Sequence, residues 1–326
     1  MQVIGNVSNG KAAIDFIQHR KPDVITMDID MPVMDGLEAT RIIMSTMPIP
    51  ILIVTGSRNA NDTSTSIEAL AAGALTVMEK PVGIGHPREA ELSKNLINMV
   101  RLMAEVTVIT RKLKPRIPVP AVSSAAFSKE LFDIISLPKI IAIGVSSGGP
   151  QALQIVFSEI TARFPVPIVV VQHITDGFLE SFTNWLENVT NLPVHIAHNE
   201  EDLKPGHIYF APNGSQMSIL KTGKVRLEKD ILKNGLNPSV AHLFTSVANE
   251  FGNSAIGIIL TGMGSDGSKE LKLLLDKGAV TIAQSKESAL INGMPGVAIN
   301  YGSAKYVLSA EEISGFLSGI ERNFRK

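Results

Sequence analysis

The stretch IIAIGVSSGGPQAL, Ile140–Leu153, decides the fold. Its apolar run Ile140–Ile143 has the composition of a buried strand, the glycines and serines after it predict a tight turn, and a helical pattern follows. A strand, a turn and a helix in this order are typical of a parallel α/β unit. The turn places Ser146 just after the strand, which raises the question of whether this serine is a nucleophile.

Short apolar runs alternate with amphipathic stretches through most of the chain, so we expect an α/β fold of two domains. The expected strands are Val3–Val7, Val24–Met27, Ile51–Val54, Leu75–Met78, Ile140–Ile143, Pro167–Gln172, Ile208–Phe210, Ile256–Leu260 and Val280–Ala283. The expected helices of the first domain are Lys11–His19, Leu37–Met47, Thr65–Ala72 and Glu89–Ala104. The stretch TRKLKPRIPVPAVSSAAFSKE, with its basic residues and prolines, predicts an exposed connector. The domains expected are 1–105 and 138–326, with a linker of 106–137.

Length and composition exclude several classes of protein. A chain of 326 residues with 44% hydrophobic and 19% charged residues is long enough for two globular cores. The net charge of −1 argues against a basic surface for nucleic acid. The absence of cysteine excludes disulfides, thiolate metal sites and a cysteine nucleophile. No apolar run approaches the roughly 20 residues of a membrane helix, and MQVIGNVSNG does not resemble a secretory signal. We therefore expect a cytoplasmic protein.

Three polar residues follow three expected strands of the second domain: Ser146, His173 and Asp266. Because the carboxyl ends of parallel strands meet at one edge of a sheet, these side chains are expected to lie together. A serine hydroxyl attacks a carbonyl only when a base takes its proton and a third group orients that base. The three residues could supply those three functions.

Each of the three residues also has a simpler interpretation. Gly144-Val145-Ser146-Ser147-Gly148 fits the pattern G-x-S-x-G, but a glycine-rich turn could instead bind a dinucleotide phosphate, although G-x-G-x-x-G is absent. His173 could be a structural hydrogen-bonding residue, and the Asp266-Gly267 pair could be an ordinary turn. Their joint position at strand ends is what favours catalysis.

Five ordered stretches resemble the catalytic domain of the chemotaxis protein-glutamate methylesterase family: IGVSSGGPQAL, VVQHITDGF, LKPGHIYFAPNG, GIILTGMGSDG and AQSKESALINGMP. The resemblance covers nearly all of Ile140–Leu317 and implies a three-layer domain with a parallel sheet. It implies that the triad is formed by Ser146, His173 and Asp266, and that backbone groups of Ser147 and Met263 lie near the oxyanion.

The resemblance also implies a reaction and its partners. The reaction is hydrolysis of glutamate methyl esters on the cytoplasmic domains of chemoreceptors, with glutamine deamidation as a side activity and no cofactor for hydrolysis. The chain departs from the family pattern where Arg-Pro-Ser-Val-Asp becomes Asn237-Pro238-Ser239-Val240-Ala241, where a histidine becomes Gln216, and where His-Met-Pro-x-Gly-Phe becomes HITDGF. The triad is retained, so we expect hydrolysis; the departures bear on the receptor contact and the rate.

The stretch DVITMDIDMPVMDGLEATR resembles the central motif of two-component receiver domains. This resemblance implies that Asp28 accepts a phosphoryl group from a chemotaxis histidine kinase. It also implies that Thr55 is the switch hydroxyl and that Lys80 binds the phosphate.

A complete receiver begins with a strand that ends in an acidic pair binding Mg²⁺, and this chain resembles a receiver that starts after that strand and its helix. In the flavodoxin-like order 2-1-3-4-5 the first strand lies inside the sheet. We therefore expect a partial flavodoxin-like receiver with weak or absent phosphorylation control, unless Met1 is not the true start. We also expect a monomer. Two rival hypotheses stay open: a serine hydrolase with a protein substrate outside chemotaxis, and an inert two-component scaffold.

Overall fold

The computed structural model describes residues 1–56, 60–83, 85–104, 137–229 and 236–324. The chain divides into two compact units, Met1–Leu113 and Lys114–Lys326, each with its own sheet. The α/β class expected from the sequence is therefore confirmed. The expected linker, 106–137, lies outside the described residues apart from Leu137, so its bounds stay a prediction. Among the helices described, none has the length and apolarity needed to cross a membrane.

The first unit is built on a three-stranded parallel sheet of order β1-β2-β3. All five residues of the central strand are buried. Side-chain caps fix the starts of two helices, because the Asn9 side chain accepts from the Ala12 N–H and the Asp35 side chain accepts from the Glu38 N–H. The elements are α1 (Gly10–His19), β1 (Ile25–Met27), α2 (Gly36–Thr46), β2 (Ile51–Thr55), α3 (Ala60–Ala71), β3 (Thr76–Glu79) and α4 (Glu89–Ala104).

The expected strand Val3–Val7 is wrong, because the described chain forms no regular element before α1. Its alternating apolar residues fit a strand, but a strand also needs a hydrogen-bonded neighbour. Within the described residues β1 pairs with β2 alone, and Val3 remains 79% exposed.

The second unit contains a seven-stranded sheet in which every neighbouring pair is parallel, in the order β12-β11-β10-β4-β5-β7-β6. The central strands β4, β5 and β10 are buried along their whole length, as expected for a sheet covered on both faces. The strands are β4 (Ile140–Val145), β5 (Ile168–Gln172), β6 (Val194–Ile196), β7 (Ile208–Phe210), β10 (Ala255–Ile259), β11 (Val280–Gln284) and β12 (Tyr306–Leu308).

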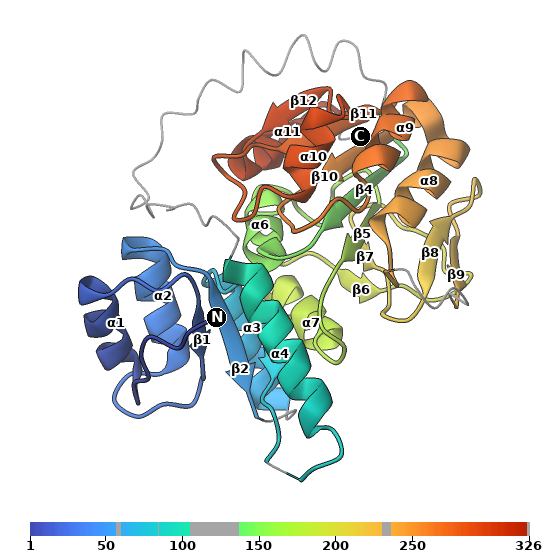
Figure 1. Cartoon of the computed structure of the whole chain (residues 1–326). Coiled ribbons are helices and arrows are strands. Elements are labelled where there is room, and N and C mark those ends of the chain that lie inside the picture. Colours follow the sequence, from blue (N-terminus) through green and yellow to red (C-terminus); the bar gives the residue numbers. More distant parts are fainter. Residues whose placement is uncertain (57–59, 84, 105–136, 230–235, 325–326) are drawn as a thin grey trace. The chain divides into compact units, whose positions relative to one another are not determined.

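Helices form two groups around this sheet. One group comprises α6 (Gly149–Val156), α7 (Leu179–Thr190) and α11 (Ala310–Phe324), and α6 contacts both of the others. The second comprises α8 (Val240–Phe251), α9 (Ser268–Asp276) and α10 (Met294–Asn300), in which α9 contacts both of the others. A small antiparallel hairpin, β8 (Gln216–Ile219) with β9 (Val225–Glu228), packs beside α8 (Figure 1).

The strands stay parallel, but the direction in which successive strands are added to the sheet reverses between β4 and β10. The connection from β4 passes through α6 to β5, while the connection from β10 passes through α9 to β11 on the opposite side. Right-handed crossovers in opposite directions place α6 and α9 on opposite faces, which gives three layers. Sites in open parallel sheets lie outside the carboxyl ends of strands at such a switch point. This is where the residues after β4 and β10 lie.

Candidate functional site

The turn after β4 presents Ser146 at the edge of the sheet. Gly148 has φ +81° and precedes the first turn of α6, a backbone conformation that L side chains rarely adopt. Gly149 allows the side chain of Gln172 to lie against the backbone of this turn, because a Cβ at position 149 would collide with Oε1 of Gln172. The Ser146 N–H donates to the carbonyl oxygen of Thr261 at 3.0 Å, and this bond ties the serine to the loop that follows β10. Ser146 is 9% exposed.

Gln172 holds two strand ends together. It is the last residue of β5 and is buried, and its Nε2 donates to the carbonyl oxygens of Ser146 at 2.9 Å and His173 at 2.8 Å. The His173 N–H in turn donates to the Val145 carbonyl oxygen at 3.0 Å. Sequence reasoning missed Gln172. A polar residue closing the otherwise apolar run PIVVVQ was the signal that could have found it.

A second glutamine plays a similar part on the other side of the switch point. Gln284 ends β11, and its Oε1 accepts from the Thr261 N–H at 2.7 Å. The Thr261 hydroxyl donates to the Ser147 carbonyl oxygen at 3.0 Å and accepts from the Ile291 N–H at 2.9 Å. Thr261 therefore joins the serine turn, the loop after β10 and the loop after β11. Neither residue was predicted to belong to the site.

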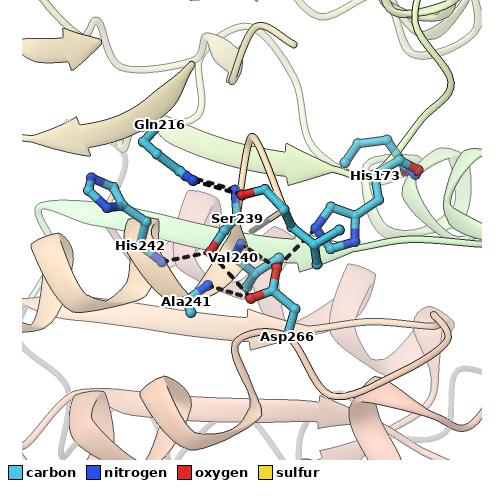
Figure 2. A network of polar contacts seen from close by, with 9 residues as sticks. His173, Gln216, Ser239, Val240, Ala241, His242 and Asp266 are labelled. Atoms are coloured by element: carbon cyan, nitrogen blue, oxygen red, sulfur yellow. Dashed lines mark hydrogen bonds and ion pairs between the residues drawn. The ribbon is translucent and has the colours of Figure 1, made fainter. Parts of the chain in front are cut away.

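His173 and Asp266 meet as expected. Nε2 of His173 lies 3.0 Å from Oδ2 of Asp266, and both side chains are largely buried. The carboxylate is out of line with the ring N–H, so the approach is a close electrostatic contact more than a well-aligned hydrogen bond. Figure 2 shows the imidazole and the start of α8 around the same carboxylate.

The start of α8 supplies the other contacts of Asp266. The carboxylate accepts from the Val240 N–H at 2.7 Å, the Ala241 N–H at 3.0 Å and the Ser239 hydroxyl at 3.3 Å. Burial of Asp266 opposes its ionisation, but the contact with His173 and these two backbone N–H groups outweigh burial, and its pKa lies below the ordinary value. Asp266 is therefore an anion at neutral pH.

The serine, histidine and aspartate predicted from the sequence thus lie after β4, β5 and β10, three adjacent strands. Within the described residues no hydrogen bond joins the Ser146 hydroxyl to His173. With Nε2 turned toward Asp266, Nδ1 is the ring nitrogen left to face a partner.

The two residues expected near an oxyanion lie in the loops that carry the triad: Ser147 in the turn after β4 and Met263 in the loop after β10. Ser147 follows the serine directly, and its carbonyl is fixed by Thr261. Met263 follows Gly262, whose Cα faces Ser146 so closely that an added Cβ would lie 2.7 Å from the serine Cβ. The Gly262 carbonyl oxygen accepts from the Gly293 and Met294 N–H groups, at 3.0 and 2.9 Å, which fixes this loop.

In the first unit, Asp28, Thr55 and Lys80 also gather at strand ends. Nζ of Lys80 lies 2.7 Å from Oδ2 of Asp28, and the Lys80 N–H donates to the Thr55 carbonyl oxygen at 2.7 Å. Thr55 is 5% exposed. Across the part of the chain that the structure describes, no three His, Asp or Glu side chains gather as metal ligands.

Comparison with known proteins gives matches to both units. Residues 141–317 match the family model described as CheB methylesterase, and residues 1–90 match that of the response regulator receiver domain. A "Protein-glutamate methylesterase/protein-glutamine glutaminase" of Nitrosospira multiformis is 45% identical over 98% of this chain and 89% of its own length. A relative of that name from Geobacter metallireducens is 42% identical, over 98% of this chain and 91% of its own. The crystal structure of the Thermotoga maritima CheB methylesterase catalytic domain aligns with a TM-score of 0.53 and 36% identity, covering 56% of this chain and 98% of that one.

Proposed function

The chain belongs to the CheB methylesterase family, and from that membership we propose that it hydrolyses glutamate methyl esters on methylated chemoreceptors. It carries a receiver domain in addition to the esterase domain. The curated relatives are also named as protein-glutamine glutaminases. Deamidation of a glutamine side chain is therefore part of the proposal, because an ester and an amide pass through the same kind of tetrahedral intermediate.

In the proposed mechanism Ser146 Oγ attacks the ester carbonyl and His173 takes the serine proton. Asp266, held as an anion, orients the imidazole and stabilises its protonated form. The C–O bond to the methoxy group then breaks, and methanol leaves with the proton from His173. Water activated by the same histidine attacks the acyl-enzyme and releases the glutamate carboxylate. Backbone N–H groups at Ser147 and Met263 are the proposed donors to the oxyanion.

The observation that carries this proposal is the contact between His173 and an aspartate that is held in its ionised form. A purely structural aspartate at this turn would need only the N–H groups of α8. An imidazole against its remaining face, at the end of the strand next to Ser146, is the pair of base and orienting carboxylate that a serine hydrolase uses.

The direct test measures methanol released from methylated chemoreceptor by the chain and by Ser146→Ala. Ser158→Ala is a matched control, since Ser158 lies just beyond the other end of α6 and bonds to Ile155 and Ser314. We expect release by the unmodified chain and by Ser158→Ala only. Serine-dependent hydrolysis of a simple ester without release from receptors would favour a substrate outside chemotaxis. No hydrolysis of any ester would favour the scaffold hypothesis.

For the receiver we propose Asp28 as the phosphoryl acceptor, with a chemotaxis histidine kinase as the donor. Lys80 supplies a cation 2.7 Å from the Asp28 carboxylate, and Thr55 supplies a hydroxyl at the next strand end. Mg²⁺ is the ion that receivers use, but no group of three ligands stands near Asp28 in the described residues. We propose weak phosphorylation control.

The receiver proposal predicts a small response to a chemical phosphodonor. Treatment with acetyl phosphate and Mg²⁺ should raise ester hydrolysis less than severalfold, and Asp28→Asn should remove whatever rise occurs. A severalfold rise that Asp28→Asn abolishes would show full control and contradict this part of the proposal. We further propose a cytoplasmic location, because the proposed substrate and phosphodonor are both cytoplasmic. A monomer is also proposed.

A further inference from the structure

Gln216 lies at the start of β8, outside the triad and on an element that supplies none of the proposed catalytic groups. It is 8% exposed, and a buried amide side chain needs hydrogen-bond partners. Its Nε2 donates to the Leu236 carbonyl oxygen at 2.7 Å, and its Oε1 accepts from the Ser239 N–H at 2.9 Å. One side chain thus binds both ends of the turn that leads into α8.

That turn sets where α8 begins. Ser239 is the N-cap of the helix, and its side chain accepts from the His242 N–H at 3.1 Å. The next two residues, Val240 and Ala241, direct their N–H groups at the Asp266 carboxylate. A shift of the turn would therefore move the donors that hold Asp266, and with them the carboxylate that faces His173 (Figure 2).

The hairpin reinforces this arrangement at a second point. On the same strand as Gln216, the Ser218 hydroxyl lies 2.7 Å from Nε2 of His242, in the first turn of α8. The Ser246 hydroxyl accepts from the Ile219 N–H at 3.1 Å one turn further along the helix. β8 is therefore a fixed support for the start of α8, and Gln216 is its contact with the turn.

We propose that Gln216 is a positioning residue for catalysis, which acts through the start of α8 on Asp266. This inference rests on the proposed function. Gln216 is one of the positions at which the chain departs from the pattern that the sequence resembles, so the contact is a property of this chain's own residues. The hydrogen bonds of Gln216 to Leu236 and Ser239 do not involve a reacting atom. The effect of Gln216 is to fix the direction of the aspartate, and hence of the imidazole.

The test compares Gln216→Met, a substitution of similar length and volume that removes the hydrogen bonds to Leu236 and Ser239, with Met217→Leu. Met217 is the neighbouring residue on β8 and is fully buried, so its substitution disturbs packing and leaves the polar contacts intact. Each of these two substitutions is made in the unmodified chain and in the chain that carries Asp266→Asn. Melting temperatures show which variants are folded. Gln216→Glu, which can still accept from the Ser239 N–H, is the second variant if Gln216→Met does not fold.

The reagent is a fluorophosphonate that labels activated serines. Ser146 Oγ forms the bond to phosphorus, the serine proton goes to His173 and fluoride leaves. Mass spectrometry follows the Ser146 adduct from seconds to days, so that slow variants remain measurable, and Ser146→Ala is the blank. No labelling of Ser146 in the unmodified chain would count against the proposed function itself, separately from this inference.

We expect Gln216→Met to slow labelling by about 10- to 100-fold in the unmodified chain, since small misplacements of catalytic groups cost factors of this size. With Asp266 replaced by asparagine, the same change should cost less than about threefold, because groups that act through one another are not additive. Met217→Leu should leave the rate unchanged. An equal loss in both backgrounds, or no loss in the unmodified chain, would overturn the inference.

Discussion

Asp266 carries a negative charge that serves both the helix start and the imidazole, so Asp266→Asn tests both roles at once. A carboxylate offers two accepting oxygens to the Val240 and Ala241 N–H groups and to His173. An asparagine amide offers one oxygen and one NH₂ group. Whichever way the amide turns, its NH₂ group faces an N–H donor of α8, either that of Val240 or that of Ala241, and in both orientations the negative charge next to the imidazole is lost.

The two consequences differ in size. A buried N–H left without its acceptor costs about 1 to 3 kcal/mol. For a unit of this size that corresponds to a fall in Tm of about 2 to 12 °C. Loss of the oriented anion in a serine triad lowers kcat about 10⁴-fold, which equals about 5.4 kcal/mol of transition-state stabilisation. The activity should therefore collapse while the protein stays folded at 25 °C.

The assay combines methanol release from methylated receptor with a thermal melt of the same sample. Asp276→Asn is the control, since it makes the same change at the exposed end of α9, where Asp276 pairs with Lys272 at the surface; it should change neither quantity measurably. If Asp266→Asn kept its activity within tenfold of the unmodified chain, the role assigned to the carboxylate would be refuted.

Three further predictions follow from described contacts. Gln172→Leu removes the donor that Ser146 and His173 share, and it should lower kcat about 100-fold with little change in KM, as read from steady-state ester hydrolysis. Gly148→Ala forces a side chain into φ +81° against Leu290, and it should lower the free energy of unfolding in urea by more than about 1 kcal/mol; an unchanged midpoint would disprove the need for glycine there. Because the folded pKa of Asp266 lies below its unfolded value, its charge stabilises the fold above about pH 4 and this contribution is lost as pH falls through the folded pKa. The stability difference between the unmodified chain and Asp266→Asn should accordingly shrink on acidification, and a difference that is constant from pH 7 to pH 3 would contradict the pKa direction.

The sequence was sufficient for the parts of the fold that rest on hydrophobic pattern and strand order. The apolar runs at Ile140 and Ile208 became β4 and β7, and the helix Glu89–Ala104 has the bounds that its periodicity predicted. Because parallel strands bring their carboxyl ends to one edge, the meeting of His173 and Asp266 also followed from where those strands end.

Contacts that depend on partners distant in sequence were not predictable in the same way. Val3–Val7 has the pattern of a strand but no neighbouring strand among the described residues. The short strands β6 and β12 can be recognised only from their pairing with β7 and β11 in the folded sheet. Gln172 and Gln284 look like ordinary polar residues at strand ends until the folded sheet shows which carbonyl and N–H groups they reach. Gln216 was noted as a departure from a pattern, but its partner turn lies twenty residues further along the chain.

The carboxylate that anchors the first turn of α8 has a consequence for how such a chain could evolve. In a descendant without hydrolase activity, Ser146 could become alanine with little loss of folding stability. The serine is held in place by its backbone N–H and carbonyl groups, which alanine also has. Asp266 has no such freedom, since natural selection for a folded protein would preserve it after selection for turnover had ceased. A copy of this gene that is no longer under selection for hydrolysis should therefore lose Ser146 well before it loses Asp266.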